Sequence, residues 1–591
     1  TPVFVIRGTN PYYDFLNCPT TWDLEDYRFY FDQMAKLRLN LVGFHSYDNE
    51  PFCAYEEDGQ MMYGAPLATS ARYGWGCVRG LETAQFAFGT GDYFHRPVFG
   101  SLSVVDHPDR DDSIRASQAL LQEALHYAKG RGIKTALGFE LRGDPTDEQV
   151  QRTLEARLRG LVNTYPMLDY VWLWQAEGWG RGRDKAPPGS PLDLLIQEER
   201  RHFEYLDDPR RVAEAVRMGE VIRLAHIILK AIAPDMRMGI CGWGGDKHMR
   251  FTDFLPGLDK MVPGDIVFTA LDNIDPTREP NVSAAYAKLS PEREKWPIPW
   301  WESDAGGRRD QWGPQPNTKI FTELCRDILS KGCQGMMSIH WRTRQVEEVA
   351  GYTARFAWAP ELSYEEYYDD FASRCFGRRH GQEMSEILRG LEELGPRWTG
   401  GGGQVECGRF SWFTGNERPQ EEKLARLAAI RRRVQIIRDD VGAGGDVQHL
   451  ERLDYLLITM DWLAAYDEAA SKIVDEVQPL VHQAEELHRQ GEMAEAKARA
   501  RQALRAMDES GLREAMQIYP RLITTQGDFG VLASVNVKAY ASYDILWERA
   551  VAVLGEEGAP EAKAALAPKA DQRVPHLVAK TPYTSQAAGA P

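Results

Sequence analysis

Two glutamates have the residue type and the setting for acid–base chemistry. Glu177 ends the run Leu-Asp-Tyr-Val-Trp-Leu-Trp-Gln-Ala, and Glu302 ends the run Trp-Pro-Ile-Pro-Trp-Trp. Each run is typical of a buried strand that delivers a carboxylate to the mouth of a barrel, beside a tryptophan that can stack on a sugar ring. Two carboxylates on opposite sides of one pocket are the minimal apparatus for cleaving a glycosidic bond. We therefore interpret the pair as candidate catalytic residues.

Glu177 is predicted to be the general acid. Neighbouring indoles, those of Trp174 and Trp179 among them, would partly desolvate its carboxyl group, raise the pKa and keep the group protonated for donation. The structural alternative is a buried glutamate that pairs with an arginine such as Arg181 or Arg183. Carboxylates at strand ends of a barrel are more often functional, and this favours the catalytic interpretation.

The second catalytic carboxylate has two candidates. Glu302 is predicted to be a nucleophile or a water-activating base, depending on its separation from the acid; a salt bridge to Arg308 or Arg309 is the structural alternative. Asp272 ends another apolar run and would serve as the base of an inverting enzyme or orient a sugar hydroxyl. It would otherwise cap a turn ahead of Pro276.

Other side chains near strand ends are candidate contacts to a sugar. Indole rings pack on apolar sugar faces, although a tryptophan is individually more often core than platform. Histidines and carboxylates would hydrogen-bond hydroxyl groups, and an arginine would bind a uronic acid carboxylate bidentately unless it pairs with nearby glutamates. The predicted substrate-binding residues are His45, Glu140, Trp174, Trp243, Trp300, Trp301, Asp304, His340, Trp341 and Arg342.

The elements that position these residues alternate regularly. Helical periodicity is expected at about 24–39, 112–129, 146–163, 211–232 and 317–331. Eight parallel βα units predict the α/β class and a closed (β/α)8 TIM barrel. An open doubly wound sheet competes, but no Gly-x-Gly-x-x-Gly follows the first run. The apolar runs read as strands are 3–8, 41–47, 133–140, 168–177, 236–243, 265–271, 296–302 and 335–342.

The chain is predicted to have two domains and a tail. Residues 1–358 form the catalytic barrel, with a long aromatic-rich loop insertion at 51–105 that is read as a pocket wall. Residues 359–566 form an α-helical C-terminal domain, and 567–591 form a flexible tail. Helices in the second domain are expected near 421–440, 447–477, 484–507 and 537–553.

The overall composition argues against several classes of partner and cofactor. The chain has 591 residues, 43% hydrophobic and 27% charged, which is ordinary for a globular protein. Its net charge of −17 argues against nucleic acid and anionic membranes as partners. The eight cysteines show no metal-binding spacing, so neither a metal nor another cofactor is expected. A homo-oligomer is compatible with the sequence.

The segment 358–367, Trp-Ala-Pro-Glu-Leu-Ser-Tyr-Glu-Glu-Tyr, and the later Cys-Phe-Gly at 375–377 resemble the passage after the barrel in family 67 α-glucuronidases and in barrels related to family 20 hexosaminidases. The resemblance implies a glycoside hydrolase barrel with a helical C-terminal domain. It also implies an acid after strand four and water-activating carboxylates after strands six and seven, the places of Glu177, Asp272 and Glu302. Ala176 departs from the Asp-Glu pair of family 20, and this puts acetamido-assisted catalysis in doubt.

The leading hypothesis is an exo-acting glycoside hydrolase. Its substrate would be a terminal sugar or uronic acid on an oligosaccharide, polysaccharide or glycoconjugate. A non-hydrolytic carbohydrate-binding barrel is one alternative, and a metal-dependent barrel isomerase or lyase is another. The chain starts without methionine, and this slightly favours a periplasmic or secreted location over a cytoplasmic one.

Overall fold

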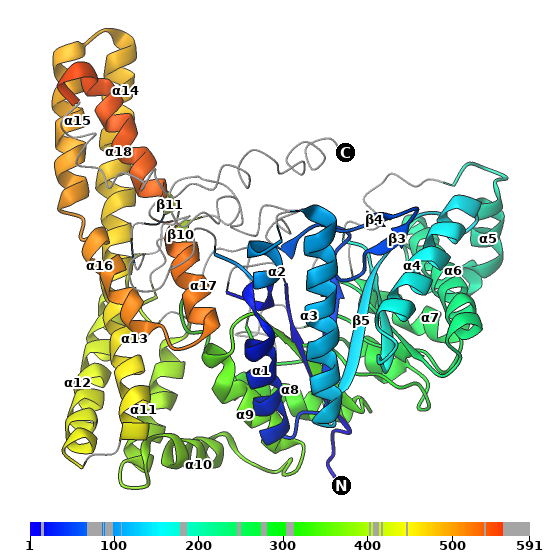
Figure 1. Ribbon diagram of the computed structural model, residues 1–591. Helices are drawn as coiled ribbons and strands as arrows, with labels where there is room; N and C mark the ends of the chain where they lie inside the picture. The colour runs from blue at the N-terminus through cyan, green and yellow to red at the C-terminus, as the bar shows by residue number, and fades with distance from the viewer. Residues whose placement is uncertain are drawn as a thin grey trace.

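Short apolar runs form one parallel sheet in the order β8-β7-β6-β5-β2-β1-β9 (Figure 1). The structure, a computed structural model, describes residues 1–13, 17–67, 86, 88, 99–107, 109–177, 186–244, 250–272, 280–302, 312–396, 398–400, 404–405, 413–414, 418–444, 447–536, 539 and 541–558. Every pairing in the sheet is parallel, as crossover helices require. The strands are β1 (Ile6–Pro11), β2 (Leu41–Ser46), β5 (Lys134–Leu141), β6 (Tyr170–Gln175), β7 (Arg237–Cys241), β8 (Val267–Phe268) and β9 (Gly335–His340).

The segment 294–301 bridges β8 and β9 and closes the sheet into a barrel. It is the predicted seventh strand, but it is not a regular one, because Pro297 and Pro299 have no N–H to donate. On the β8 side, the N–H of Ile298 donates to the carbonyl of Ala270 at 2.9 Å. On the β9 side, the carbonyls of both prolines accept backbone N–H groups at 3.1 and 3.0 Å. The prolines therefore occupy the positions where only an acceptor is used.

Helices cover the outside of the barrel (Figure 1). The five helices predicted in this region are present, with ends within a few residues of expectation. The first predicted strand is shifted: β1 begins at Ile6 and continues through buried Thr9 and Asn10, whereas Val5 is exposed. The covering helices are α1 (Leu24–Lys36), α2 (Leu102–Val105), α3 (Arg110–Gly130), α4 (Glu148–Thr164), α5 (Pro191–Glu199), α6 (Pro209–Ile232), α7 (Leu255–Met261), α8 (Thr318–Ser330) and α9 (Glu347–Phe356).

Glycines inside the barrel make room for a large indole. Trp172 is fully buried, and its indole N–H donates to the hydroxyl of Thr269 at 3.0 Å. A Cβ atom on Gly43 would lie 3.1 Å from the Trp172 ring, and one on Gly138 would lie 1.8 Å from its carbonyl oxygen. Gly43 on β2 therefore leaves space for the indole, whereas Gly138 on β5 leaves space for the close approach of the β6 backbone.

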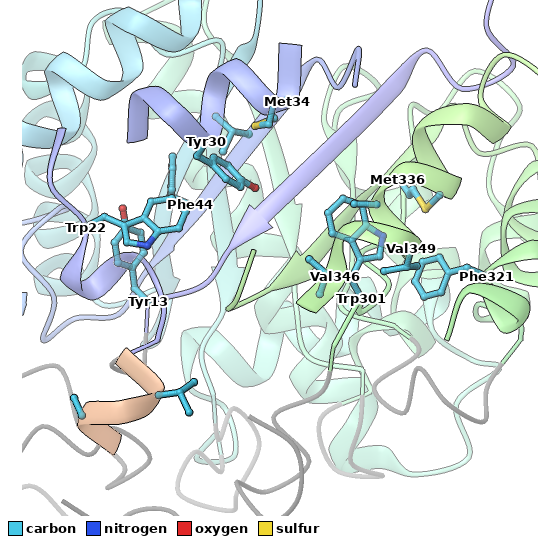
Figure 2. Close-up of a cluster of buried hydrophobic side chains, with 14 of the residues drawn as sticks. Tyr13, Trp22, Tyr30, Met34, Phe44, Trp301, Phe321, Met336, Val346 and Val349 are labelled. Carbon is cyan, nitrogen blue, oxygen red and sulfur yellow. The ribbon is translucent and has the colours of Figure 1, made fainter. Parts of the chain in front are cut away.

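A second apolar layer lies between the strands and the covering helices. Figure 2 shows part of it, where Tyr30 and Met34 of α1 and Phe321 of α8 gather around the strands. Because successive residues of a strand face opposite sides, one residue faces the barrel interior and the next faces this outer layer. This alternation decides which of the predicted site residues reach the mouth.

The chain continues as a helical region, much of which stands beside the barrel as an elongated bundle (Figure 1). The predicted helix at 484–507 is two helices, because Gly491 adopts a left-handed conformation that ends the first of them. No described helix is long and apolar enough to cross a membrane. The helices are α10 (Tyr364–Phe376), α11 (Gly381–Leu394), α12 (Glu421–Ala443), α13 (Val447–Lys472), α14 (Gln478–Gln490), α15 (Met493–Asp508), α16 (Leu512–Ile518), α17 (Gln526–Val535) and α18 (Ala541–Leu554).

Short antiparallel strand pairs lie outside the barrel sheet. Within the predicted loop insertion, β3 (Tyr55–Glu57) and β4 (Gln60–Met62) form an antiparallel hairpin. In the helical region, β10 (Gln404–Val405) pairs with β11 (Phe413–Thr414). Most of 68–98, where the insertion is richest in aromatic residues, and the predicted tail 567–591 lie outside the described residues. The interpretation of the insertion as a pocket wall therefore remains a prediction.

Candidate active site at the barrel mouth

The carboxyl ends of the parallel strands carry a connected group of aromatic rings. Tyr12 follows β1, Tyr47 follows β2 and Trp243 follows β7. His45 lies 4.4 Å from both Tyr47 and Trp174, and Trp174 lies 5.7 Å from Trp243, measured between ring centroids. Trp243 is partly exposed, whereas the other four rings are buried. It is therefore the ring of this group best placed to meet a ligand.

Trp300 and Trp341 extend the same group across the other side of the barrel. Their ring centroids lie 5.3 Å apart, and Trp341 lies 5.9 Å from Tyr12. Both belong to the cluster inside the barrel and are nearly fully buried. Four of the predicted tryptophans, including Trp174 and Trp243, are thus brought together.

Glu177 stands at the rim of this group with its side chain partly exposed. Its Oε2 accepts a long hydrogen bond of 3.5 Å from the hydroxyl of Tyr47. The Tyr47 hydroxyl in turn accepts from the hydroxyl of Tyr12 at 3.0 Å, and that hydroxyl lies 3.0 Å from Nδ1 of His45. Three strand ends therefore converge on the carboxylate predicted to be the acid.

Glu140 supports this rim from below. It is fully buried, its Oε1 accepts the backbone N–H of Glu177 at 2.8 Å, and its Oε2 pairs with the guanidinium of Arg142. A carboxylate held at both oxygens is a positioning group for the Glu177 backbone. It lies beside the predicted acid, although as a scaffold rather than as an exposed sugar contact.

Glu302 occupies a closed ion pair. Its side chain is 0% exposed, and Oε2 accepts from Nε of Arg342 at 2.8 Å. Its Oε1 accepts the backbone N–H groups of Trp341 and Arg342. Arg342 also donates to the carbonyl of Gly313 at 2.8 Å. The predicted salt-bridge alternative thus exists, but with Arg342 as the partner, so neither charge is free to meet a substrate in this arrangement.

Asp272 lies at the carboxyl end of the β8 segment and is partly exposed. Its backbone N–H donates to the carbonyl of Ile298 at 3.1 Å, which ties it to the closing segment. Its Oδ2 accepts the backbone N–H of Ser283 at 2.6 Å. The carboxylate therefore fixes the backbone at Ser283. The turn predicted ahead of Pro276 lies outside the described residues, and the partial exposure of Asp272 leaves it within reach of a ligand.

Two predicted contacts point away from the mouth. Trp301 packs in the outer layer near Phe321 and Val349 (Figure 2), and its indole N–H donates to the hydroxyl of Thr353 at 3.3 Å. His340 accepts at Nε2 from Tyr30 of α1 at 2.7 Å. Strand alternation explains both, since each neighbours an inward-facing tryptophan.

His340 is held in one form by its surroundings. Its Nδ1 donates to the carbonyl of Arg342 at 2.9 Å, because a carbonyl can only accept. Burial lowers the pKa of His340 to about 4, against smaller opposing effects of the Glu302 charge and the Arg342 carbonyl. It is therefore a neutral structural histidine at physiological pH.

The sequence interpretation missed several residues of the mouth. Tyr12 and Tyr47 each stand two residues after an inward-facing position, Asn10 and His45, so the strand period could have identified them. Both amide atoms of Asn10, together with the indole N–H groups of Trp174 and Trp300, are buried and have no hydrogen-bond partner among the described residues. The barrel interior below the mouth therefore contains polar atoms that form no hydrogen bond among the described residues.

Some predictions concern residues that the structure does not describe. The candidate substrate contact Asp304 and the neighbouring Arg308 and Arg309 lie outside the described residues, as do Trp179 and the arginines proposed to pair with Glu177. Among the residues that are described, no group of three or more histidines, cysteines, aspartates and glutamates is arranged to hold a metal ion.

Comparisons with known proteins find structural similarity at low sequence identity. No protein-family profile and no curated protein sequence matches the chain. A mutant O-GlcNAc hydrolase of Thermobaculum terrenum is similar at 12% identity and TM-score 0.42, covering 94% of this chain and 97% of that one. A GH138 enzyme targeting pectin rhamnogalacturonan II is similar at 10% identity and TM-score 0.43, covering 92% of this chain and 68% of that one.

A third similar structure is a GH20 exo β-N-acetylglucosaminidase from Vibrio harveyi, with 12% identity and a TM-score of 0.33, covering 66% of this chain and 59% of that one. All three TM-scores are below 0.5, so these similarities carry no conclusion about this chain. The more specific resemblance to family 67 stays a prediction.

Proposed function

We propose that this protein is a glycoside hydrolase that works at the barrel mouth. One observation carries the proposal: the ends of β6, β7 and β8, three adjacent strands, present Glu177, Trp243 and Asp272 in that order, and all three are partly exposed. An indole flanked by two carboxylates can seat a sugar ring and bring both charges to its glycosidic bond.

The proposed roles follow from the contacts of each carboxylate. Glu177, which is hydrogen-bonded to Tyr47 at the edge of the aromatic group, donates a proton to the leaving oxygen. Asp272 activates the attacking water or orients a hydroxyl beside it. Glu302 is assigned a structural role, since its charge is already matched by Arg342. If Glu302 were the nucleophile instead, that ion pair would have to open first.

The substrate is proposed to be a neutral terminal sugar, because Arg342 is not available to bind a carboxylate. The uronic acid hypothesis relied on this guanidinium, which is engaged by Glu302 and Gly313. The partly exposed ring at the mouth, Trp243, is uncharged and suits the apolar face of a neutral sugar. Exo action remains part of the proposal.

The test is hydrolysis of a panel of aryl glycosides by the wild type and matched variants. Glu177→Gln and Asp272→Asn are each expected to lower kcat by about 10²–10⁴-fold, the usual contribution of a positioned acid or base. Glu198→Gln, at an exposed position of α5, is the control. Full activity in Glu177→Gln would contradict the assignment of the acid.

A carbohydrate-binding barrel without hydrolysis is the second candidate. It is favoured by the closed Glu302–Arg342 pair, which removes one of the two carboxylates first predicted to be catalytic. In this case, sugars of the panel would quench the fluorescence of Trp243 without being cleaved. The quenching would disappear in Trp243→Ala.

A further inference from the structure

A series of alternating charges leads from the backbone of Glu177 to a helix on the outside of the barrel. Oε1 of Glu140 accepts the N–H of Glu177 at 2.8 Å, and Oε2 pairs with Nη2 of Arg142. Nε of Arg142 lies 2.9 Å from Oδ2 of Asp48. Oδ1 of Asp48 accepts from Nη2 of Arg157, on α4, at 2.8 Å. Glu140, Arg142, Asp48 and Arg157 thus form one ion-pair network that joins β5, the loop after β2 and α4.

The two ends of this network are its most buried members. The side chain of Glu140 is 0% exposed and that of Arg157 is 6% exposed, while Asp48 and Arg142 between them are partly exposed. Carboxylates and guanidinium groups alternate, so each charge has an opposite charge beside it. Removing one partner of a buried ion pair is strongly destabilising. Substitutions that keep a charge but change its geometry therefore test the network with less damage to the fold.

Aromatic rings fix the orientation of Arg157. Its guanidinium carbon lies 3.9 Å from the ring centroid of Phe139 and 4.7 Å from that of Tyr63. Phe139 precedes Glu140 on β5, and Tyr63 directly follows β4 of the insertion hairpin. Nη1 of Arg157 also donates to the backbone carbonyl of Glu140, at 3.5 Å. A planar guanidinium can stack on rings and pair with carboxylates at the same time, whereas a lysine ammonium is a point charge.

We propose that Arg142, Asp48 and Arg157 are positioning residues for Glu177. They act through the carboxylate of Glu140, which holds the N–H of Glu177. Through Arg157, both α4 and the insertion hairpin help to set where Glu177 stands at the mouth. The inference rests on the proposed function in taking Glu177 as the acid, although the position of its backbone can be measured without a substrate.

The backbone amide signal of Glu177 measures this position. Deuterated whole protein labelled with ¹⁵N-glutamate gives ¹⁵N–¹H correlation spectra, in which Glu177→Gln assigns the signal by its loss. A charge-assisted hydrogen bond to a carboxylate is strong, and weakening it moves the amide proton signal upfield. Arg157→Lys keeps the charge but loses the stacked fork, and it is expected to cause this shift. Arg159→Lys is the matched control, because Arg159 lies on the same helix and pairs with half-exposed Glu155 at 2.6 Å.

Asp48→Asn breaks the middle of the network and is expected to move the same signal, so the test does not depend on a single variant. The other glutamate signals report whether each variant is folded. An unmoved Glu177 signal in either folded variant would overturn the proposal. An equal shift in Arg159→Lys would also overturn it, because the effect would then not depend on the network.

Kinetics on aryl glycosides separate positioning of the acid from a general loss of structure. A phenol leaving group needs the proton of the acid, whereas a dinitrophenolate departs without it. Arg157→Lys is expected to lower kcat for a phenyl glycoside by about 10²-fold, the usual effect of a misplacement of about 1 Å, and to leave kcat for the dinitrophenyl glycoside near the wild-type value. Equal losses on both would overturn the positioning role. If the wild type cleaves neither glycoside, the proposed function fails, and the amide signal still decides whether the network positions Glu177.

Discussion

At the residue scale, the closed pair of Glu302 and Arg342 is the main difference from the predicted site. Both side chains are almost completely buried, and Glu302 receives three hydrogen bonds. Taking two charges out of water is costly, and the mutual attraction offsets that cost only while both partners are present. The pair is therefore most sensitive to the removal of one member.

Arg342→Leu is expected to destabilise the protein by about 3–5 kcal/mol, since it leaves Glu302 buried without a counter-charge. Urea unfolding followed by tryptophan fluorescence measures the change. Arg355→Leu is the matched control, because it breaks the half-exposed pair with Asp370 and should cost less than about 1 kcal/mol. The double variant Glu302→Gln/Arg342→Leu should recover part of the loss; equal losses in Arg342→Leu and Arg355→Leu would refute this account.

At the scale of elements, the proline-containing segment between β8 and β9 decides whether the barrel closes. Its N–H donors at Trp296 and Ile298 bond to the β8 side, whereas Pro297 and Pro299 offer only carbonyl groups, which accept from β9. The run Trp-Pro-Ile-Pro-Trp thus places its prolines at positions where no N–H is needed. Sequence reasoning identified this run as a strand, but pairing partners were needed to explain why two prolines are tolerated there.

Ile298→Pro should therefore lower the free energy of unfolding much more than the loss of the isoleucine side chain alone. It removes the donor to Ala270, and an unmet hydrogen bond in a buried position costs about 1–3 kcal/mol. Ile298→Ala controls for the lost side chain. The free energy of unfolding of the two variants, compared by urea titration, should differ by at least this amount, and equal values would show that the segment does not close the barrel through this bond.

At the scale of the whole molecule, the barrel and the helical region meet around a cavity. Its walls include Arg342 and Glu348 from the barrel side, and Arg452, Tyr455 and Trp462 from α13. Arg452 forms its ion pair with Glu347, at 2.5 Å, rather than with the adjacent Glu348. Burial, followed by the negative charge of Glu347, raises the pKa of Glu348 to about 8.

The stability of the junction should consequently fall as pH rises. Unfolded glutamate releases its proton near pH ~4.3, whereas native Glu348 holds it up to about 8. Between these values the native state binds more protons, so the free energy of unfolding decreases with pH. Urea titrations at several pH values should show a smaller decrease in Glu348→Gln. Glu198→Gln should keep the wild-type slope, and an unchanged slope in Glu348→Gln would contradict the prediction.

The sequence by itself determined the barrel and most of its helices, because hydrophobic periodicity is a local property of the chain. It also singled out four tryptophans that the structure brings together. It could not determine which strand-end side chains face the mouth. Trp301 and His340 fall in the outer layer through strand alternation, and only tertiary structure shows where that alternation starts. It also could not choose a partner for Glu302, since Arg342 and the nearby Arg308 and Arg309 are chemically equal in sequence. Only the packing of β9 against the closing segment brings one guanidinium, with two backbone N–H groups, onto that carboxylate.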